Sequence, residues 1–167
     1  MKTLSRLAAR AYLAIGLLSV VAAGPAWAAA GDKARISGLN DVAFGAIANL
    51  SIDQRSGQSL CLYTSSAGGG YSITATGSGA GGAFTLASGG STLAYEVEWA
   101  DSPGLSTGSA LSAGSPLSGQ VSPASNQNCS PAPATTASLI VVLRAAALGS
   151  ATTGAYSGTL TLLVAPL

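Results

Sequence analysis

Glu96 and Glu98 are the two residues whose type and spacing come closest to a catalytic pair. Side chains at positions i and i+2 of a strand lie on the same face, and two carboxylates facing one cleft can act as the acid and the nucleophile of a glycosidase. The alternative is that both are solvated charges on the water-facing side of a strand, which is the usual place for such residues. Aromatic residues, which would bind sugar rings, are only 5% of the chain. We therefore favour the solvated face and expect no catalytic residues and no enzymatic activity.

Other familiar chemistries lack a required feature. The chain has no histidine, so a serine hydrolase of the usual form has no base. Gly77, Gly79 and Gly82 match the spacing of a dinucleotide-binding loop, but that loop must open a helix, and residues 83–87 have the pattern of a strand. A hairpin turn explains these glycines better. We expect no cofactor and no metal ion.

Residues 1–28 have the pattern of a secretory signal peptide. A basic start precedes an apolar run at residues 11–23, and Ala26 and Ala28 supply a cleavage site between small residues. Removing this segment leaves one domain, residues 29–167, with four basic and six acidic side chains. Such a domain is a poor ligand for nucleic acid, and it holds no apolar run long enough to span a membrane. We expect an exported protein with no nucleic-acid partner and no membrane span in the mature chain.

Cys61 and Cys129 are the only cysteines. In an exported chain, an even count without neighbouring metal ligands favours a disulfide over a metal site. In the chain-entropy model, closing so long a loop would stabilise the fold by about 4 kcal/mol. Whether the two thiols meet in space is a question for the structure.

The mature chain has the pattern of an all-β sandwich. Short apolar or alternating runs are separated by clusters of Gly, Ser, Pro and Asn, which is typical of strands in two packed sheets. Seven or eight strands are expected, and one or two more short ones should lie inside the Ser-, Gly- and Pro-rich stretch at 101–133. The expected ranges are 34–47, 59–63, 71–76, 83–87, 92–99, 139–143 and 155–167, with short strands at 110–112 and 117–121.

Two of these strands predict where the core lies. In residues 92–99 apolar and polar side chains alternate, so one face should be buried and the other, with Glu96 and Glu98, should face water. Residues 139–143 are apolar on both faces, as expected of a central strand that is covered on both sides. The side chains expected to be buried in the first of these strands are Leu93, Tyr95, Val97 and Trp99.

The last strand, 155–167, has an apolar face but no following strand with which to pair. Tyr156, Leu160, Leu162 and Val164 fall on one side of it, with the period of 2 that marks a half-buried strand. An edge left open in this way must be covered by something. We take this as an indication of assembly with another chain.

Several of these segments, in order, resemble the spore coat protein U-like domain, whose members are subunits of archaic chaperone-usher pili. The similarity covers nearly the whole mature chain, and its most specific parts are the last strand and the Leu-x-Tyr strand. The segments are Phe44 and Gly45, Cys61 in the run SLCLYTSS, 71–75, 93–97 and 154–162.

The resemblance implies an incomplete immunoglobulin-like sandwich that lacks its final strand. A periplasmic chaperone would hold it first, an outer-membrane usher would be a further partner, and the N-terminal extension of a neighbouring subunit would supply the missing strand. By this analogy Tyr156, Leu160, Leu162 and Val164 line the donor-strand acceptor groove, with the first strand on its other side. The protein would pass through the periplasm to a cell-surface pilus that supports attachment or biofilm formation.

The segment before Phe44 departs from the family pattern. Residues 32–42 would be either a short donor strand or the first strand of the domain, because Ile36, Leu39 and Val42 do not alternate. A cysteine that many relatives carry in the first strand is absent here. We therefore expect a minor or terminal subunit rather than the main rod component. The alternative is a free-standing secreted sandwich that binds a surface or a glycan through its Gly- and Ser-rich loops.

Overall fold

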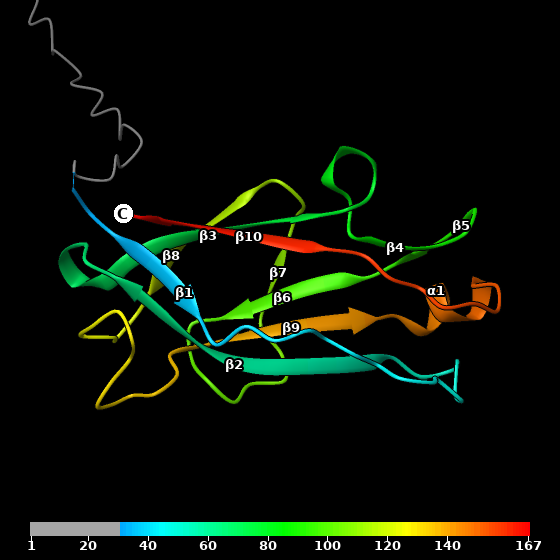
Figure 1. Ribbon diagram of the computed structural model, residues 1–167, viewed down its shortest axis with the longest axis horizontal. Coiled ribbons are helices and arrows are strands. Elements are labelled where there is room, and N and C mark those ends of the chain that lie inside the picture. Colours follow the sequence, from blue (N-terminus) through cyan, green and yellow to red (C-terminus); the bar gives the residue numbers. More distant parts are fainter. Residues whose placement is uncertain (1–30) are drawn as a thin grey trace, which may run out of the picture.

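The structure, a computed structural model, describes residues 31–167 (Figure 1). It is an all-β sandwich of antiparallel sheets with one short helix, so the predicted fold class is confirmed. The predicted signal peptide, residues 1–28, lies outside the described residues and stays a prediction.

The larger sheet has five strands, and β9 lies at its centre between β2 and β6. All seven residues of β9 are buried, as its uninterrupted apolar run predicted, because both faces of the strand are covered. The strands in sheet order are β1 (Ala34–Ser37), β2 (Gln54–Thr64), β9 (Ala137–Leu143), β6 (Glu96–Ala100) and β7 (Ser109–Leu111).

The smaller sheet has three strands, and a separate hairpin extends from one end of the sandwich. The order in the smaller sheet is β10 (Leu160–Pro166), β3 (Gly70–Gly77) and β8 (Pro116–Val121). The predicted short strands of the long loop are thus confirmed as β7 and β8. They carry the chain from the edge of one sheet to the edge of the other and close that side of the sandwich. The remaining elements are the hairpin of β4 (Thr85–Ser88) and β5 (Ser91–Ala94), helix α1 (Ala145–Ser150), and two short 3-10 turns at Ala67–Gly69 and Ala80–Gly82.

The core between the two sheets is built from alternating residues of facing strands. Trp99 of β6 and Tyr71 of β3 are fully buried, and their rings meet edge to face. The indole N–H of Trp99 donates a hydrogen bond to the Tyr71 hydroxyl at 2.9 Å, which satisfies the indole donor in the core. Burial raises the pKa of Tyr71 to about 12.

The predicted disulfide is present. Cys61 of β2 is bonded to Cys129 in the loop between β8 and β9, with 5.8 Å between the two Cα atoms. The bond ties a long, polar loop to β2, the second strand of the larger sheet.

Four strands differ clearly from their predicted extent. β2 begins at Gln54 rather than at 59, and the last strand begins at Leu160 rather than at 155, so Tyr156 lies in the loop before β10. The strand expected at 92–99 divides at Tyr95 into β5, which pairs with β4, and β6, which pairs with β9. The strand expected at 34–47 ends at Ser37, because Gly38 takes a positive φ of 81° and turns the chain away from β2. Since Ala34–Ser37 pairs with β2, this part of segment 32–42 is the first strand of the domain.

Candidate functional site

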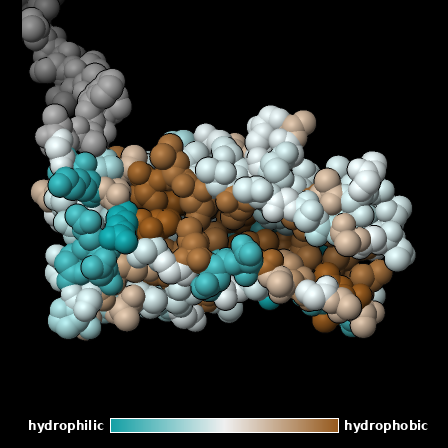
Figure 2. Space-filling view, viewed as in Figure 1, coloured by the Kyte–Doolittle hydropathy of each residue, from teal (hydrophilic) through white to brown (hydrophobic). Residues whose placement is uncertain are grey.

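A long apolar groove runs along the sandwich beside β10. Its volume is about 1110 Å³. One wall is the chain that follows β1, residues 39–47, and the other is formed by residues 151–160 and Leu162. Figure 2 shows hydrophobic residues gathered along the middle of this face, in a hollow between paler, more polar margins.

The floor of the groove is the hydrophobic core itself. Leu139, Val141 and Leu143 of β9 lie at its base together with Tyr95 and Leu148 of α1, all of them buried. Core side chains therefore line an open space that no other side chain of the described residues fills. A groove of this kind is suited to receive apolar side chains from outside.

Three of the four predicted groove residues line this space. Tyr156, Leu160 and Leu162 are among its lining residues, whereas Val164 is not. Val164 lies on the same face of β10 and is half-buried against the core, but β1 contacts β10 near this end (Figure 1). The groove is therefore shorter toward the end of β10 than the sequence pattern predicted.

For the opposite wall, the sequence predicted only that the first strand forms it and identified no individual residues. Its contribution comes from Val42, Phe44 and Ile47, which are half-buried and face the core cluster. These side chains do not follow a period of 2, because residues 39–47 do not form a strand. No residue pattern within this segment marks it as a groove wall, so the sequence alone could not assign these three residues.

The backbone of β10 is open toward the groove. The Leu167 N–H donates to the Gly70 carbonyl at 3.0 Å, in the same register that pairs Leu160 with Gly77. In an antiparallel ladder, the N–H and C=O groups of successive residues point to opposite sides of the strand. Because Leu167 bonds to β3, residues 161, 163 and 165 also point their N–H and C=O groups at β3. Leu160, Leu162 and Val164 must point theirs the other way. Within residues 31–167, β10 is an edge strand of the smaller sheet. The outward-pointing N–H and C=O groups of Leu160, Leu162 and Val164 therefore have no strand partner.

The groove carries little charge. Asp41 is its one charged lining residue, and the acidic side chains with ion-pair partners in the described chain, Asp53, Glu96 and Glu98, lie outside it. The site therefore offers apolar side chains and free backbone groups rather than a charged ligand pocket.

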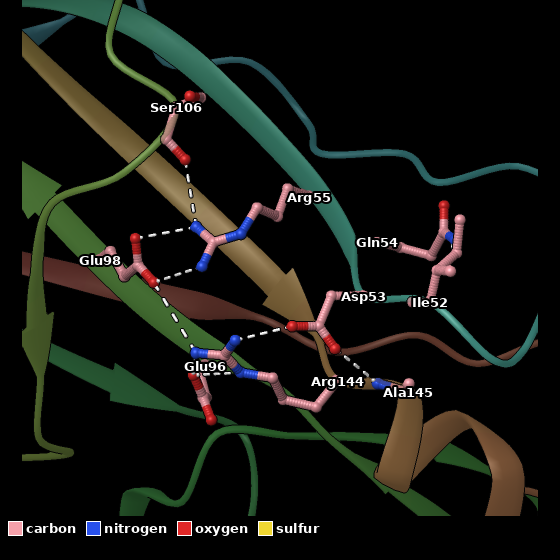
Figure 3. A network of polar contacts seen from close by, with 9 residues as sticks. All are labelled: Ile52, Asp53, Gln54, Arg55, Glu96, Glu98, Ser106, Arg144 and Ala145. Atoms are coloured by element: carbon pink, nitrogen blue, oxygen red, sulfur yellow. Dashed lines mark hydrogen bonds and ion pairs between the residues drawn. The ribbon is translucent and has the colours of Figure 1, made fainter.

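The two glutamates proposed as an alternative catalytic pair belong to an ion-pair network on the other face of the larger sheet (Figure 3). Arg55 makes two hydrogen bonds of 3.0 Å with the carboxylate of Glu98, which also accepts the Gly108 N–H at 3.0 Å. Glu96 accepts a hydrogen bond from Arg144 at 2.8 Å. The prediction that both glutamates face water is right for Glu96 and wrong for Glu98, whose exposed fraction is 7%. The cross-strand arginine and the loop at 101–108 cover Glu98, and a single strand cannot show either of them.

Glu98 is not suited to be the acid of a glycosidase. The Arg55 guanidinium holds the pKa of Glu98 below its ordinary value, mainly through their hydrogen bonds. A carboxyl that protonates a leaving group needs a raised pKa instead. The geometry fits a structural ion pair.

The same network positions α1 at the end of the groove. One carboxylate oxygen of Asp53 accepts the Ala145 N–H at 2.9 Å, and the other accepts a hydrogen bond from Arg144 at 2.7 Å. These contacts lower the pKa of Asp53, the first of them most strongly. Asp53 thus fixes the start of the helix whose Leu148 lies at the groove floor.

The described part of the chain holds neither a cluster of metal-ligating side chains nor a helix that could cross a membrane. Residues 31–167 contain no group of three or more metal-ligating side chains placed to share an ion. No helix in this part of the chain has the length and apolar character needed to cross a membrane.

Comparisons with known proteins bear on the fold. No family model matches the chain, and no curated protein matches it. Among solved structures, the fold is similar to a chain of a chaperone–tip adhesin complex described as vital for synergistic activation of CFA/I fimbriae biogenesis, with a TM-score of 0.51 and 14% identity. The match covers 81% of this chain and 41% of that chain, so this protein spans less than half the length of its structural neighbour. The sandwich is therefore of a kind found in a fimbrial assembly complex.

Proposed function

We propose that this protein is a structural, non-enzymatic subunit of a surface pilus, a spore coat protein U-like domain that receives a strand from a neighbouring subunit. The strand would lie in the groove between residues 39–47 and β10. A periplasmic chaperone would occupy the groove first, and an outer-membrane usher would exchange that chaperone for the neighbour. The assembled pilus at the cell surface would support attachment or biofilm formation.

The observation that carries this proposal is the open edge of β10 beside an unfilled groove whose floor is formed by core residues. Leu160 and Leu162 direct their side chains into the groove and their backbone groups toward its opening, so both need a partner. An added strand would satisfy both at once, since main-chain hydrogen bonds give affinity and alternate side chains fill the floor. The similarity to a chain of a fimbrial chaperone–adhesin complex supports partners of the same class.

We propose a minor or terminal position in the pilus, which the use of the first strand supports. Ala34–Ser37 pairs with β2, and residues 39–47 form a wall of the groove. Residues that build the domain in this way are not free to leave it as a donor strand. The role of a main rod component, which both donates and accepts, is therefore the less favoured one.

The test is to supply the missing strand in the same chain. A strand of about ten residues with alternating Val and Thr would be fused after Leu167 through a short Gly-Asn linker, so that it can run antiparallel to β10. Soluble periplasmic yield and melting temperature would be compared with those of the unfused chain and of a fusion with Asp at the Val positions. We expect the Val fusion alone to convert an aggregating chain into a stable monomer.

The opposite result favours the alternative function. If the unfused chain is already a stable monomer and the Val fusion melts no higher than the Asp fusion, the sandwich needs no donor. A free-standing secreted module that binds a surface or glycan would then be the better account.

A further inference from the structure

The wall at residues 39–47 is not attached to the sheet by a backbone ladder. The pairing of β1 with β2 stops at Ser37, and residues 39–47 make no backbone-to-backbone hydrogen bond within the described chain. Apolar contacts of Val42, Phe44 and Ile47 hold the far part of the wall. Such contacts are not directional, so they do not by themselves fix the wall's position.

One side chain replaces the missing ladder. Gln58 lies on the inner face of β2, lines the groove, and binds the backbone of Asn40 through both ends of its amide. The Asn40 N–H donates to Gln58 Oε1 at 2.8 Å, and Gln58 Nε2 donates to the Asn40 carbonyl at 3.0 Å. This is the donor and acceptor pattern that a paired strand residue would offer.

We infer that Gln58 is a positioning residue of the groove, which holds the wall at residues 39–47 in the place where a docking strand needs it. The inference rests on the proposed function. A wall that moves must be ordered when a strand binds, and that ordering reduces affinity. Because Gln58 already holds the backbone of Asn40 in the free protein, the free-energy cost of ordering the wall on binding is smaller.

The chain offers a close control for this role. Gln54 lies on the same strand and the same face, and its amide also binds backbone carbonyls of the preceding loop, those of Asn49 and Ile52, both at 3.4 Å. Gln54 does not line the groove.

The experiment measures binding of one defined probe to three proteins. The probe is a fluorescent synthetic peptide of about ten residues with Val at alternate positions, Thr between them and Lys at both ends. Its dissociation constant would be measured by anisotropy for the parent, Gln58→Ala and Gln54→Ala. Two net hydrogen bonds correspond to about a tenfold weakening for Gln58→Ala, whereas Gln54→Ala should bind as the parent does.

The outcomes separate this inference from the proposed function. If the parent binds the peptide and Gln58→Ala binds equally well, Gln58 has no positioning role while the strand-acceptor function stands. If the parent itself does not bind, the proposed function fails and the inference falls with it. Should Gln58→Ala not fold, Gln58→Met takes its place, because it keeps the length of the side chain and loses both amide hydrogen bonds to the Asn40 backbone without adding a charge. It should bind more weakly than the parent at neutral pH, and parent-like binding would overturn the inference.

Discussion

Leu162 and Leu163 are adjacent and chemically identical, but they lie on opposite faces of β10. Leu162 lines the groove, whereas Leu163 is 65% exposed on the outer face of the smaller sheet. The pair therefore separates a role in the groove from a general effect of charge in this strand. We expect Leu162→Asp to abolish the rise in melting temperature that the fused Val-Thr strand gives, because a carboxylate would have to be buried without a partner.

The matched variant is Leu163→Asp, which should keep that rise because its side chain stays in water. Differential scanning fluorimetry of each variant, with and without the fused strand, measures both effects. An equal loss in the two variants would show that the strand does not dock over the groove face of β10.

Glu98 contributes stability that depends on pH. Its pKa is lowered in the folded protein, chiefly by the Arg55 guanidinium. The contribution is therefore complete above the unfolded pKa of about 4.3 and is lost as the pH falls through the lower folded value. We expect Glu98→Gln to lower the free energy of unfolding by about 2 kcal/mol at pH 7, the range of a hydrogen bond to a charged group.

The difference between parent and Glu98→Gln should shrink below about pH 4, where the parent also becomes protonated. Urea unfolding at several pH values measures this. Glu96→Gln is the control, since the side chain of Glu96 is 49% exposed and its ion pair with Arg144 is open to solvent. A constant difference across the acid range would mean that the charge of Glu98 is not what stabilises the fold.

At the scale of elements, β10 should show two kinds of amide. Residues 161, 163 and 165 point their N–H groups at β3, whereas Leu160, Leu162 and Val164 point theirs away from it. We expect fast hydrogen exchange at Leu162 and slow exchange at Leu163 in the unfused chain, and slow exchange at both once a strand is fused. Exchange followed by NMR on residue-assigned amides tests this, and equal protection of both amides before fusion would contradict the open edge.

The disulfide links two elements that are distant in the chain, since 68 positions separate Cys61 from Cys129. Replacing both residues by Ala should lower the free energy of unfolding by about 4 kcal/mol in the chain-entropy model, because the unfolded chain regains the freedom that the closed loop removes. Guanidinium unfolding of the fused protein measures this. A reducing agent should destabilise the parent by a similar amount and leave the double variant unchanged.

The elements that sequence reasoning placed well are those whose pattern is complete within one segment. The apolar run of β9, the alternation in β10 and the turn residues around β3 each depend on neighbouring residues, so their strands and buried faces were predictable. The burial of Glu98 depends on Arg55, which is remote in the sequence and adjacent only across the sheet. The wall at residues 39–47 depends on Gln58 in the same way, and neither partner leaves a local pattern.

At the scale of the whole molecule, the two sides of the sandwich differ. On one side β7 and β8 pass from sheet to sheet, and the strand β8 carries Pro116 and a glycine of positive φ, Gly119, which make it a poor template for another strand. On the other side β10 offers an alternating strand beside an open groove (Figure 2). The proposed strand addition is thus directed to one side of the molecule.

The near absence of charge in the groove has a kinetic consequence. Electrostatic steering accelerates association only where the meeting surfaces carry complementary charge, and Asp41 alone offers any here. An isolated strand should therefore find this groove no faster than about 10⁵–10⁶ M⁻¹s⁻¹, at a rate nearly the same in dilute buffer and in strong brine. With so slow and salt-indifferent an encounter, the proposed function gains most from a partner that delivers the strand already in place, and a filled groove, held by apolar contacts and backbone hydrogen bonds, would not be loosened by salt.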